Sequence, residues 1–187
     1  MKRRFCSFVL KCLRWRCVGT PVPVPKCLIL GAPHTSLWDF VISKLFYTSI
    51  GGKASVLVKK EFFFWPIGGV IRRMGAIPVD RSKGAPLVKQ LVTAFQSYET
   101  LHVAIAPEGT RKPTSKWKGG FHTIAKAADI PVYLGYFDWG KREIGIAEEL
   151  ILSDDQQADL KYVRQWYKNR GVIGKYPKNF ITGTDLE

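Results

Sequence analysis

Residues 26–40, KCLILGAPHTSLWDF, join an apolar run, two chain-breaking residues and a polar helix start. The first five residues have the length and apolar content of a short buried strand, which Gly31 and Pro33 end. Ser36 and Asp39 have the spacing at which a serine and an acidic side chain bond to the free N–H groups of a helix start. The stretch therefore predicts a strand, a tight loop and a helix.

His34 and Asp39 lie on opposite sides of this predicted break. On one continuous helix of 3.6 residues per turn, side chains five positions apart would point about 140° away from each other. A histidine on the loop and an aspartate in the first turn of the helix can instead meet. The alternative is that Asp39 only supports the helix start and that His34 is an ordinary polar loop residue.

Strand-like and helix-like stretches alternate through the rest of the chain. Strands are predicted near residues 26–30, 54–58, 76–79, 102–106 and 130–137, and helices near 36–50, 85–99, 119–128 and 155–169. Residues 133–137 and 143–146 are predicted to form a hairpin at the edge of the sheet. Short apolar strands flanked by helical segments favour an α/β fold, a single domain whose mostly parallel, twisted sheet is flanked by helices.

Polar and charged residues follow three of the predicted strands. His34 follows the first strand, Arg81 follows residues 76–79, and the turn after residues 102–106 carries Glu108, Gly109, Thr110 and Arg111. Parallel strands end at one edge of a sheet, and such folds bind ligands beyond the carboxyl ends of their strands. We therefore expect these residues to meet at one edge.

These side chains are suited to moving a proton beside an anion. Histidine has an ordinary pKa of about 6.5, so it accepts a proton close to neutrality, and a neighbouring carboxylate fixes its tautomer. His34 is therefore the candidate base and Asp39 its orienting partner. Arg81 and Arg111 offer forked donors for a phosphate, to which the backbone N–H groups of the glycine-containing turn add. The alternative for each arginine is an ordinary surface charge.

The other histidines and the cysteines provide no further catalytic or metal-binding pattern. His102 and His122 are expected to be structural, because neither has a carboxylate at a suitable spacing and His102 begins a predicted strand. The cysteines, at positions 6, 12, 17 and 27, form no C-x-x-C pair and no zinc-site spacing with histidine. We expect reduced thiols in a cytosolic setting and no metal site.

The charge balance predicts an anionic partner. The 187 residues are 46% hydrophobic, which excludes a disordered chain, and 29 lysines and arginines face 15 acidic residues, giving a net charge of +14. Nucleic acid, a phospholipid surface and a phosphorylated substrate all satisfy this excess.

The first twenty residues have the pattern of a basic amphipathic helix. Lys11, Arg14 and Arg16 interrupt any apolar run long enough for a signal peptide or a membrane span. Phe5 and Phe8 belong to an apolar face of helical spacing, with most basic residues elsewhere. This pattern predicts a helix lying in a lipid interface. The alternative is an amphipathic helix packed on the domain.

Residues 59–69, KKEFFFWPIGG, place four successive aromatic residues beside two lysines. Four consecutive aromatic side chains cannot all face a core from one element, so part of this run is expected to meet lipid or an acyl chain. The alternative is a buried turn packed on the sheet.

Four motifs together resemble the glycerolipid acyltransferase family, whose best-known members are the 1-acylglycerol-3-phosphate acyltransferases. The matching segments are HTSLWD (34–39, H-x4-D), GAIPVDR (75–81), PEGTR (107–111) and, more loosely, IPVYLG (130–135), in the family's order. The serine of the commoner form N-H-x-S-x-x-D is present as Ser36. The chain departs from the pattern at Pro33, where the family usually has asparagine, and near Gly135, where the fourth motif lacks its second proline.

The resemblance implies acyl transfer from acyl-CoA or acyl carrier protein to a hydroxyl of a lysophospholipid such as 1-acylglycerol-3-phosphate, with no other cofactor. It implies that His34 is the base and Asp39 its orienting carboxylate. The residues expected to hold the phosphate end of the acceptor are Arg81, Glu108, Gly109 and Arg111. Residues 1–20 would lie on the membrane surface and residues 21–187 would form the acyltransferase domain, peripheral at the cytoplasmic face. A lyso-aminolipid acceptor is the alternative.

A basic nucleic-acid-binding module is the competing class of function. This class accounts for the arginines, and its Trp and Phe side chains would stack on nucleic-acid bases. It gives no role to the His34–Asp39 spacing or to APEGTR at 106–111. A membrane-surface protein with a lost enzyme site is a third possibility, against which the intact His34 and Asp39 argue. We therefore expect a lipid partner and no nucleic acid.

Overall fold

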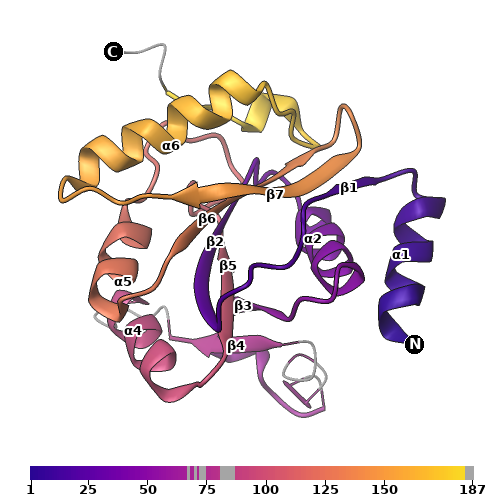
Figure 1. Ribbon diagram of the computed structural model, residues 1–187, viewed down its shortest axis with the longest axis horizontal. Coiled ribbons are helices and arrows are strands. Elements are labelled where there is room, and N and C mark those ends of the chain that lie inside the picture. Colours follow the sequence, from indigo (N-terminus) through magenta and orange to yellow (C-terminus); the bar gives the residue numbers. More distant parts are fainter. Residues whose placement is uncertain (67, 70, 72–74, 81–86, 184–187) are drawn as a thin grey trace.

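A single, mostly parallel sheet forms the centre of the protein. The computed structural model describes residues 1–66, 68–69, 71, 75–80 and 87–183 (Figure 1). Within these ranges the sheet has seven strands, in the spatial order β1 (Arg16–Val18), β7 (Glu143–Leu150), β6 (Val132–Asp138), β2 (Lys26–Ala32), β5 (Leu101–Ile105), β3 (Ala54–Lys59) and β4 (Ala76–Val79). Every neighbouring pair is parallel except β6 with β7. The predicted fold class is confirmed.

Helices cover both faces of this sheet (Figure 1). Those contributing to the core of one face are α1 (Lys2–Cys12) and α2 (Leu37–Ser49), and those of the other are α4 (Leu87–Ser97), α5 (Gly120–Ala128) and α6 (Gln156–Arg170). Two short 3-10 helices are η1 (Lys60–Phe62) and η2 (Pro177–Asn179). Each helix and strand predicted in residues 26–170 is therefore present, with ends that differ by a few residues.

Strand β2 is buried on both of its sides, which explains its continuous apolar sequence. Leu28 and Leu30 pack into the core shared with α5 and α6, whereas Cys27 and Ile29 pack into the core shared with α1 and α2. Side chains of a strand alternate between its two faces, so a central strand under two helical layers needs apolar residues at every position. This burial fixes the strand from which the candidate site projects.

The N-terminal segment differs from its prediction. The helix ends at Cys12, well inside the predicted segment 1–20, and Arg16–Val18 forms a strand parallel to β7. Because β1 lies outside β7, the predicted hairpin of β6 and β7 forms but is not at the edge of the sheet. Strand β1 has only three residues, all exposed, so it lacks the apolar alternation that reveals strands in a sequence.

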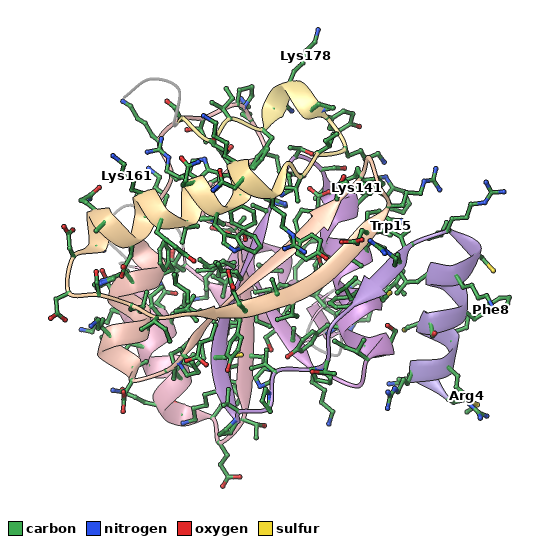
Figure 2. The ribbon with its side chains drawn as sticks, turned by 45° about the horizontal axis from the view of Figure 1, so that its top comes forward. Arg4, Phe8, Trp15, Lys141, Lys161 and Lys178 are labelled. Carbon is green, nitrogen blue, oxygen red and sulfur yellow. The ribbon has the colours of Figure 1, made fainter. Side chains whose placement is uncertain are left out.

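Helix α1 packs on the domain through one face and leaves aromatic side chains exposed on another. Leu10 is buried in the core shared with α2, whereas Phe5 and Phe8 are 64% and 65% exposed. Figure 2 shows Phe8 pointing away from the body of the protein, while Trp15 lies toward it. No helix in the described ranges combines the length and apolar character needed to cross a membrane.

Candidate active site

The candidate site is built around the loop that follows β2. This strand lies between β6 and β5, and all three run in the same direction. The residues that follow them, His34 after β2, Glu108 after β5 and Trp139 after β6, therefore project from the same edge of the sheet. The loop after β2, which carries His34, and the turn after β5, which carries Glu108, are expected to lie at one edge of the sheet, and their positions agree with that expectation.

Asp39 holds this loop and starts helix α2. Its Oδ2 accepts hydrogen bonds of 2.7 Å from the backbone N–H groups of both Thr35 and Ser36, and Ser36 Oγ accepts one of 3.2 Å from Trp38 N–H. These contacts form the predicted reciprocal cap, with Ser36 as the N-cap residue. The carboxylate of Asp39 is thus fixed by the loop that carries His34.

The imidazole of His34 lies beside this carboxylate. His34 Nδ1 is 3.4 Å from Asp39 Oδ2, and the side chains are 28% and 1% exposed, respectively. Nε2 of His34 makes no hydrogen bond to any residue that the structure describes. The pair therefore combines a buried carboxylate with a solvent-accessible imidazole, an arrangement that orients one ring nitrogen and leaves the other for a substrate proton.

Trp139 supplies a contact that the sequence did not predict. Its Nε1–H donates to Asp39 Oδ1 at 2.7 Å, so the second carboxylate oxygen is also fixed. The Trp15 and Trp139 rings pack nearly perpendicular to each other, with centroids 5.0 Å apart, and the Trp139 backbone N–H donates to Ile173 O at 2.8 Å. Its place directly after β6 is the available sequence signal, because that strand ends beside β2.

Glu108 lies on the other side of the loop. Its Oε1 accepts a 2.7 Å hydrogen bond from His34 N–H, while Oε2 is buried and has no hydrogen-bond partner among the described residues. Burial raises the pKa of the Glu108 carboxyl to about 7, and the bond from His34 N–H offsets part of that increase. The carboxyl group thus supports the backbone of the candidate base and sits near the midpoint of its titration at neutral pH.

The remaining predicted phosphate-binding residues have varied surroundings. Gly109 has a φ of +66°, and its N–H donates to Ala106 O at 3.0 Å, so this N–H is already used within the turn. Thr110 Oγ1 accepts a bond from the N–H two residues later. Arg111 is exposed at the end of the same turn. Arg81 lies outside the described residues.

The segment after α6 closes one side of the loop. Tyr176 N–H donates to Thr35 Oγ1 at 3.2 Å. Gly174 is buried against the same threonine, where an added Cβ would lie 2.7 Å from Thr35 Cγ2 and 3.3 Å from Pro33 Cβ. Only glycine allows this close approach. A segment about 140 residues later in the chain therefore packs against the loop that carries His34.

The other two histidines lie in structural positions. His102 Nδ1 is 2.6 Å from Tyr47 Oη, and its Nε2 is 2.6 Å from Val24 O. The expectation that neither histidine has a carboxylate partner is wrong for His122, whose Nε2 is 3.4 Å from Asp159 Oδ2. The two residues lie on α5 and α6, which only the folded chain brings together. The His122 side chain is 11% exposed and the same nitrogen also faces Ser153 O, so this pair is less open than the His34 pair.

Comparison with known families now defines the class of protein. The family model described as Acyltransferase matches residues 16–134, more than half of the chain, and the chain therefore belongs to the acyltransferase family. The matched range contains the His34 loop and the Glu108 turn. Trp139 and the segment after α6 lie beyond it.

A solved structure shares the fold. The chain is similar to the crystal structure of the 1-acyl-sn-glycerophosphate (LPA) acyltransferase PlsC from Thermotoga maritima, with a TM-score of 0.60 and 17% sequence identity. The alignment covers 91% of this chain and 78% of that one. Comparison with curated protein sequences gives no significant match.

Proposed function

We propose that the protein transfers a fatty acyl group from an acyl thioester, acyl-CoA or acyl carrier protein, to a hydroxyl of a lysophospholipid such as 1-acylglycerol-3-phosphate. The observation that carries this proposal is the contact of 3.4 Å between His34 Nδ1 and the buried Asp39 carboxylate. Membership of the acyltransferase family and the fold shared with a 1-acyl-sn-glycerophosphate acyltransferase support it.

In the proposed mechanism, His34 acts as a general base without forming an acyl-enzyme. Its Nε2 takes the proton of the acceptor hydroxyl while the oxygen attacks the thioester carbonyl. The new C–O bond forms, the C–S bond breaks, and the leaving thiolate receives the proton from the imidazolium. Asp39 holds the ring and stabilises its charged form. Base assistance of this kind contributes roughly 10²–10⁴-fold to the rate.

The acceptor's phosphate end would lie against the turn after β5. Arg111 and, from the sequence, Arg81 supply the positive charge, and the turn at Gly109 and Thr110 brings the arginine close to the end of the strand. Glu108 contributes by holding the backbone of His34. No metal ion has a role in this proposal.

We further propose that the protein works as a peripheral protein on an anionic membrane surface, at the cytoplasmic face. The exposed Phe5 and Phe8 and the basic residues of α1 support contact with an anionic membrane surface. In the aromatic run after β3, Phe64 is 54% and Trp65 is 91% exposed, so part of that run is available to lipid. Each basic residue near an anionic surface contributes about 1 kcal/mol to binding.

The direct test is the rate of acyl transfer by His34→Ala. Labelled acyl-CoA would be supplied with 1-acylglycerol-3-phosphate, other lysophospholipids and a lyso-aminolipid. We expect the variant to lose at least about a hundredfold in kcat, because the base is removed, while its thermal unfolding stays close to wild type. The matched control is His122→Gln, which alters a histidine at the same distance from a carboxylate but away from the site. Wild-type turnover by His34→Ala would exclude the mechanism.

A further inference from the structure

The ammonium of Lys175 lies close to two indole rings. Its Nζ is 5.0 Å from the ring centroid of Trp38 and 4.9 Å from that of Trp139. Both distances fall within the range at which an ammonium group is attracted to an aromatic face. The residue as a whole is half-buried.

The backbone around Lys175 is held against the candidate site. Gly174 packs on Thr35, the residue after the candidate base, and Tyr176 N–H bonds to the hydroxyl of that threonine. The indole of Trp139 also donates to Asp39 Oδ1, whereas Trp38 lies in the first turn of α2 and is 54% exposed. The backbone on either side of Lys175 therefore contacts the loop that carries His34, and its ammonium lies beside the indole that bonds to Asp39.

The charge of Lys175 has no carboxylate counterpart in the described part of the chain. No described Asp or Glu oxygen lies within 4.0 Å of its Nζ. The nearby hairpin offers a contrast, since Lys141 Nζ lies 3.7 Å from Asp138 Oδ2. An aromatic face attracts a cation but does not neutralise it, so the Lys175 ammonium keeps its capacity to bind an anion.

We infer that Lys175 is an anion-binding residue of the site and contacts a phosphate group of a substrate. This inference rests on the proposed function, which supplies two phosphate-bearing candidates, the headgroup of the acceptor and the nucleotide part of CoA. A lysine contributes a compact charge with three donors, which suits contact with a phosphate group. The residue lies outside the range of the family match, 16–134, so it would be a contribution of this chain's C-terminal segment.

Binding measurements test the inference without requiring turnover. Calorimetric titration with glycerol 3-phosphate and with CoA would compare wild type with Lys175→Ala, Lys175→Arg and Lys178→Ala. The last variant is the matched control, because Lys178 projects from the body of the protein (Figure 2) and is exposed. We expect Lys175→Ala to weaken binding of one ligand about tenfold, as for loss of a charge-assisted hydrogen bond, and the other two variants to stay near wild type.

Kinetics then identify the source of the phosphate. A rise in KM for 1-acylglycerol-3-phosphate, with no change for the phosphate-free 1-acylglycerol, would assign the acceptor. A rise in KM for acyl-CoA, with no change for acyl-pantetheine, would assign the donor. A fall in kcat that is equal for all substrates, with unchanged KM, would overturn the inference, because Lys175 would then only support Trp139.

The outcomes separate this inference from the proposed function. If wild type binds a phosphate ligand, Lys175→Ala loses that binding and no acyl transfer is found, the anion site stands and the proposed function fails. If wild type transfers acyl groups but Lys175→Ala binds both ligands as wild type does, the anion site is excluded and the proposed function stands. Absence of binding of either ligand to wild type also overturns the inference.

Discussion

The indole N–H of Trp139 donates a hydrogen bond of 2.7 Å to Asp39 Oδ1 across 100 positions of sequence. The other oxygen, Oδ2, accepts two backbone N–H groups of the loop and faces the imidazole of His34. The two oxygens of this carboxylate thus contact different parts of the chain. The indole fixes the plane of the carboxylate, and with it the direction in which Asp39 meets the histidine.

Replacing Trp139 with Phe should slow turnover more than it weakens substrate binding. The substitution keeps an aromatic ring beside Trp15 but removes the donor to Asp39 Oδ1. A hydrogen bond to a charged group is worth about 1.5–3 kcal/mol, so kcat should fall about ten- to a hundredfold while KM for the acyl donor changes little. Steady-state kinetics with saturating acceptor measure both quantities.

Trp166→Phe is the matched control for this substitution. Trp166 also donates its Nε1–H to a carboxylate, that of Glu148, but does so on the exposed side of α6. Loss of this hydrogen bond in Trp166→Phe should leave kcat near the wild-type value. Equal effects of the two substitutions on kcat would mean that Trp139 has no special influence on Asp39.

Glu108→Gln should change how stability depends on pH. Burial raises the pKa of Glu108 from 4.5 to about 7, so between these values the folded protein keeps a proton that the unfolded chain releases. The folded state then binds more protons than the unfolded state, and the free energy of unfolding falls as pH rises through this window and levels off above it. From pH 4.5 to pH 8, the unfolding free energy of wild type should fall by about 3 kcal/mol relative to that of the glutamine variant.

Urea unfolding at pH 5, 6, 7 and 8 would measure this difference. The control is Glu99→Gln, which neutralises an exposed carboxylate and should follow wild type at every pH. A constant difference in unfolding free energy between wild type and Glu108→Gln would show that the buried carboxyl does not titrate in this range.

Substituting Phe5 and Phe8 together with Ser should weaken binding to anionic vesicles. Both side chains are about two-thirds exposed on α1, so their removal should spare the core and the unfolding free energy. Insertion of one such side chain into an apolar phase is worth about 1.5–3 kcal/mol, and we expect at least a tenfold loss in partitioning. Co-sedimentation with vesicles of phosphatidylglycerol and phosphatidylcholine measures it.

The control for this pair is Tyr162→Ser, which removes an aromatic side chain that is 51% exposed on α6. Its vesicle binding should match wild type. If the double variant sediments with vesicles as wild type does, α1 does not contact lipid through these residues. High salt should weaken binding of every variant, because the basic residues act through screened charge.

Local patterns were sufficient to predict the centre of the molecule. The apolar run of β2, the break at Gly31 and Pro33, and the cap formed by Ser36 and Asp39 all depend on residues within one short segment. The structure follows these predictions because a strand buried on both faces and a capped helix each have a strong local signal.

The contacts that segments far along the chain make with the His34 loop have no local sequence pattern of this kind. Trp139 falls in the connection between the two predicted strands of the hairpin, and nothing in the sequence near Lys175 indicates that two indoles lie close to its ammonium. The burial of Glu108 likewise depends on how the turn after β5 packs beneath the His34 loop. Each of these features arises from tertiary packing between residues far apart in sequence, where local periodicity carries no information.

The carboxylate of Asp39 both caps α2 and lies beside the imidazole of His34. Melting of the first turn of that helix would release the carboxylate from the Ser36 N–H and from the histidine in the same event. Under the proposed mechanism, a nascent or partly denatured chain would therefore not catalyse acyl transfer, even with its histidine fully accessible to water. Acquisition of activity during refolding should accordingly coincide with formation of this helix rather than follow it.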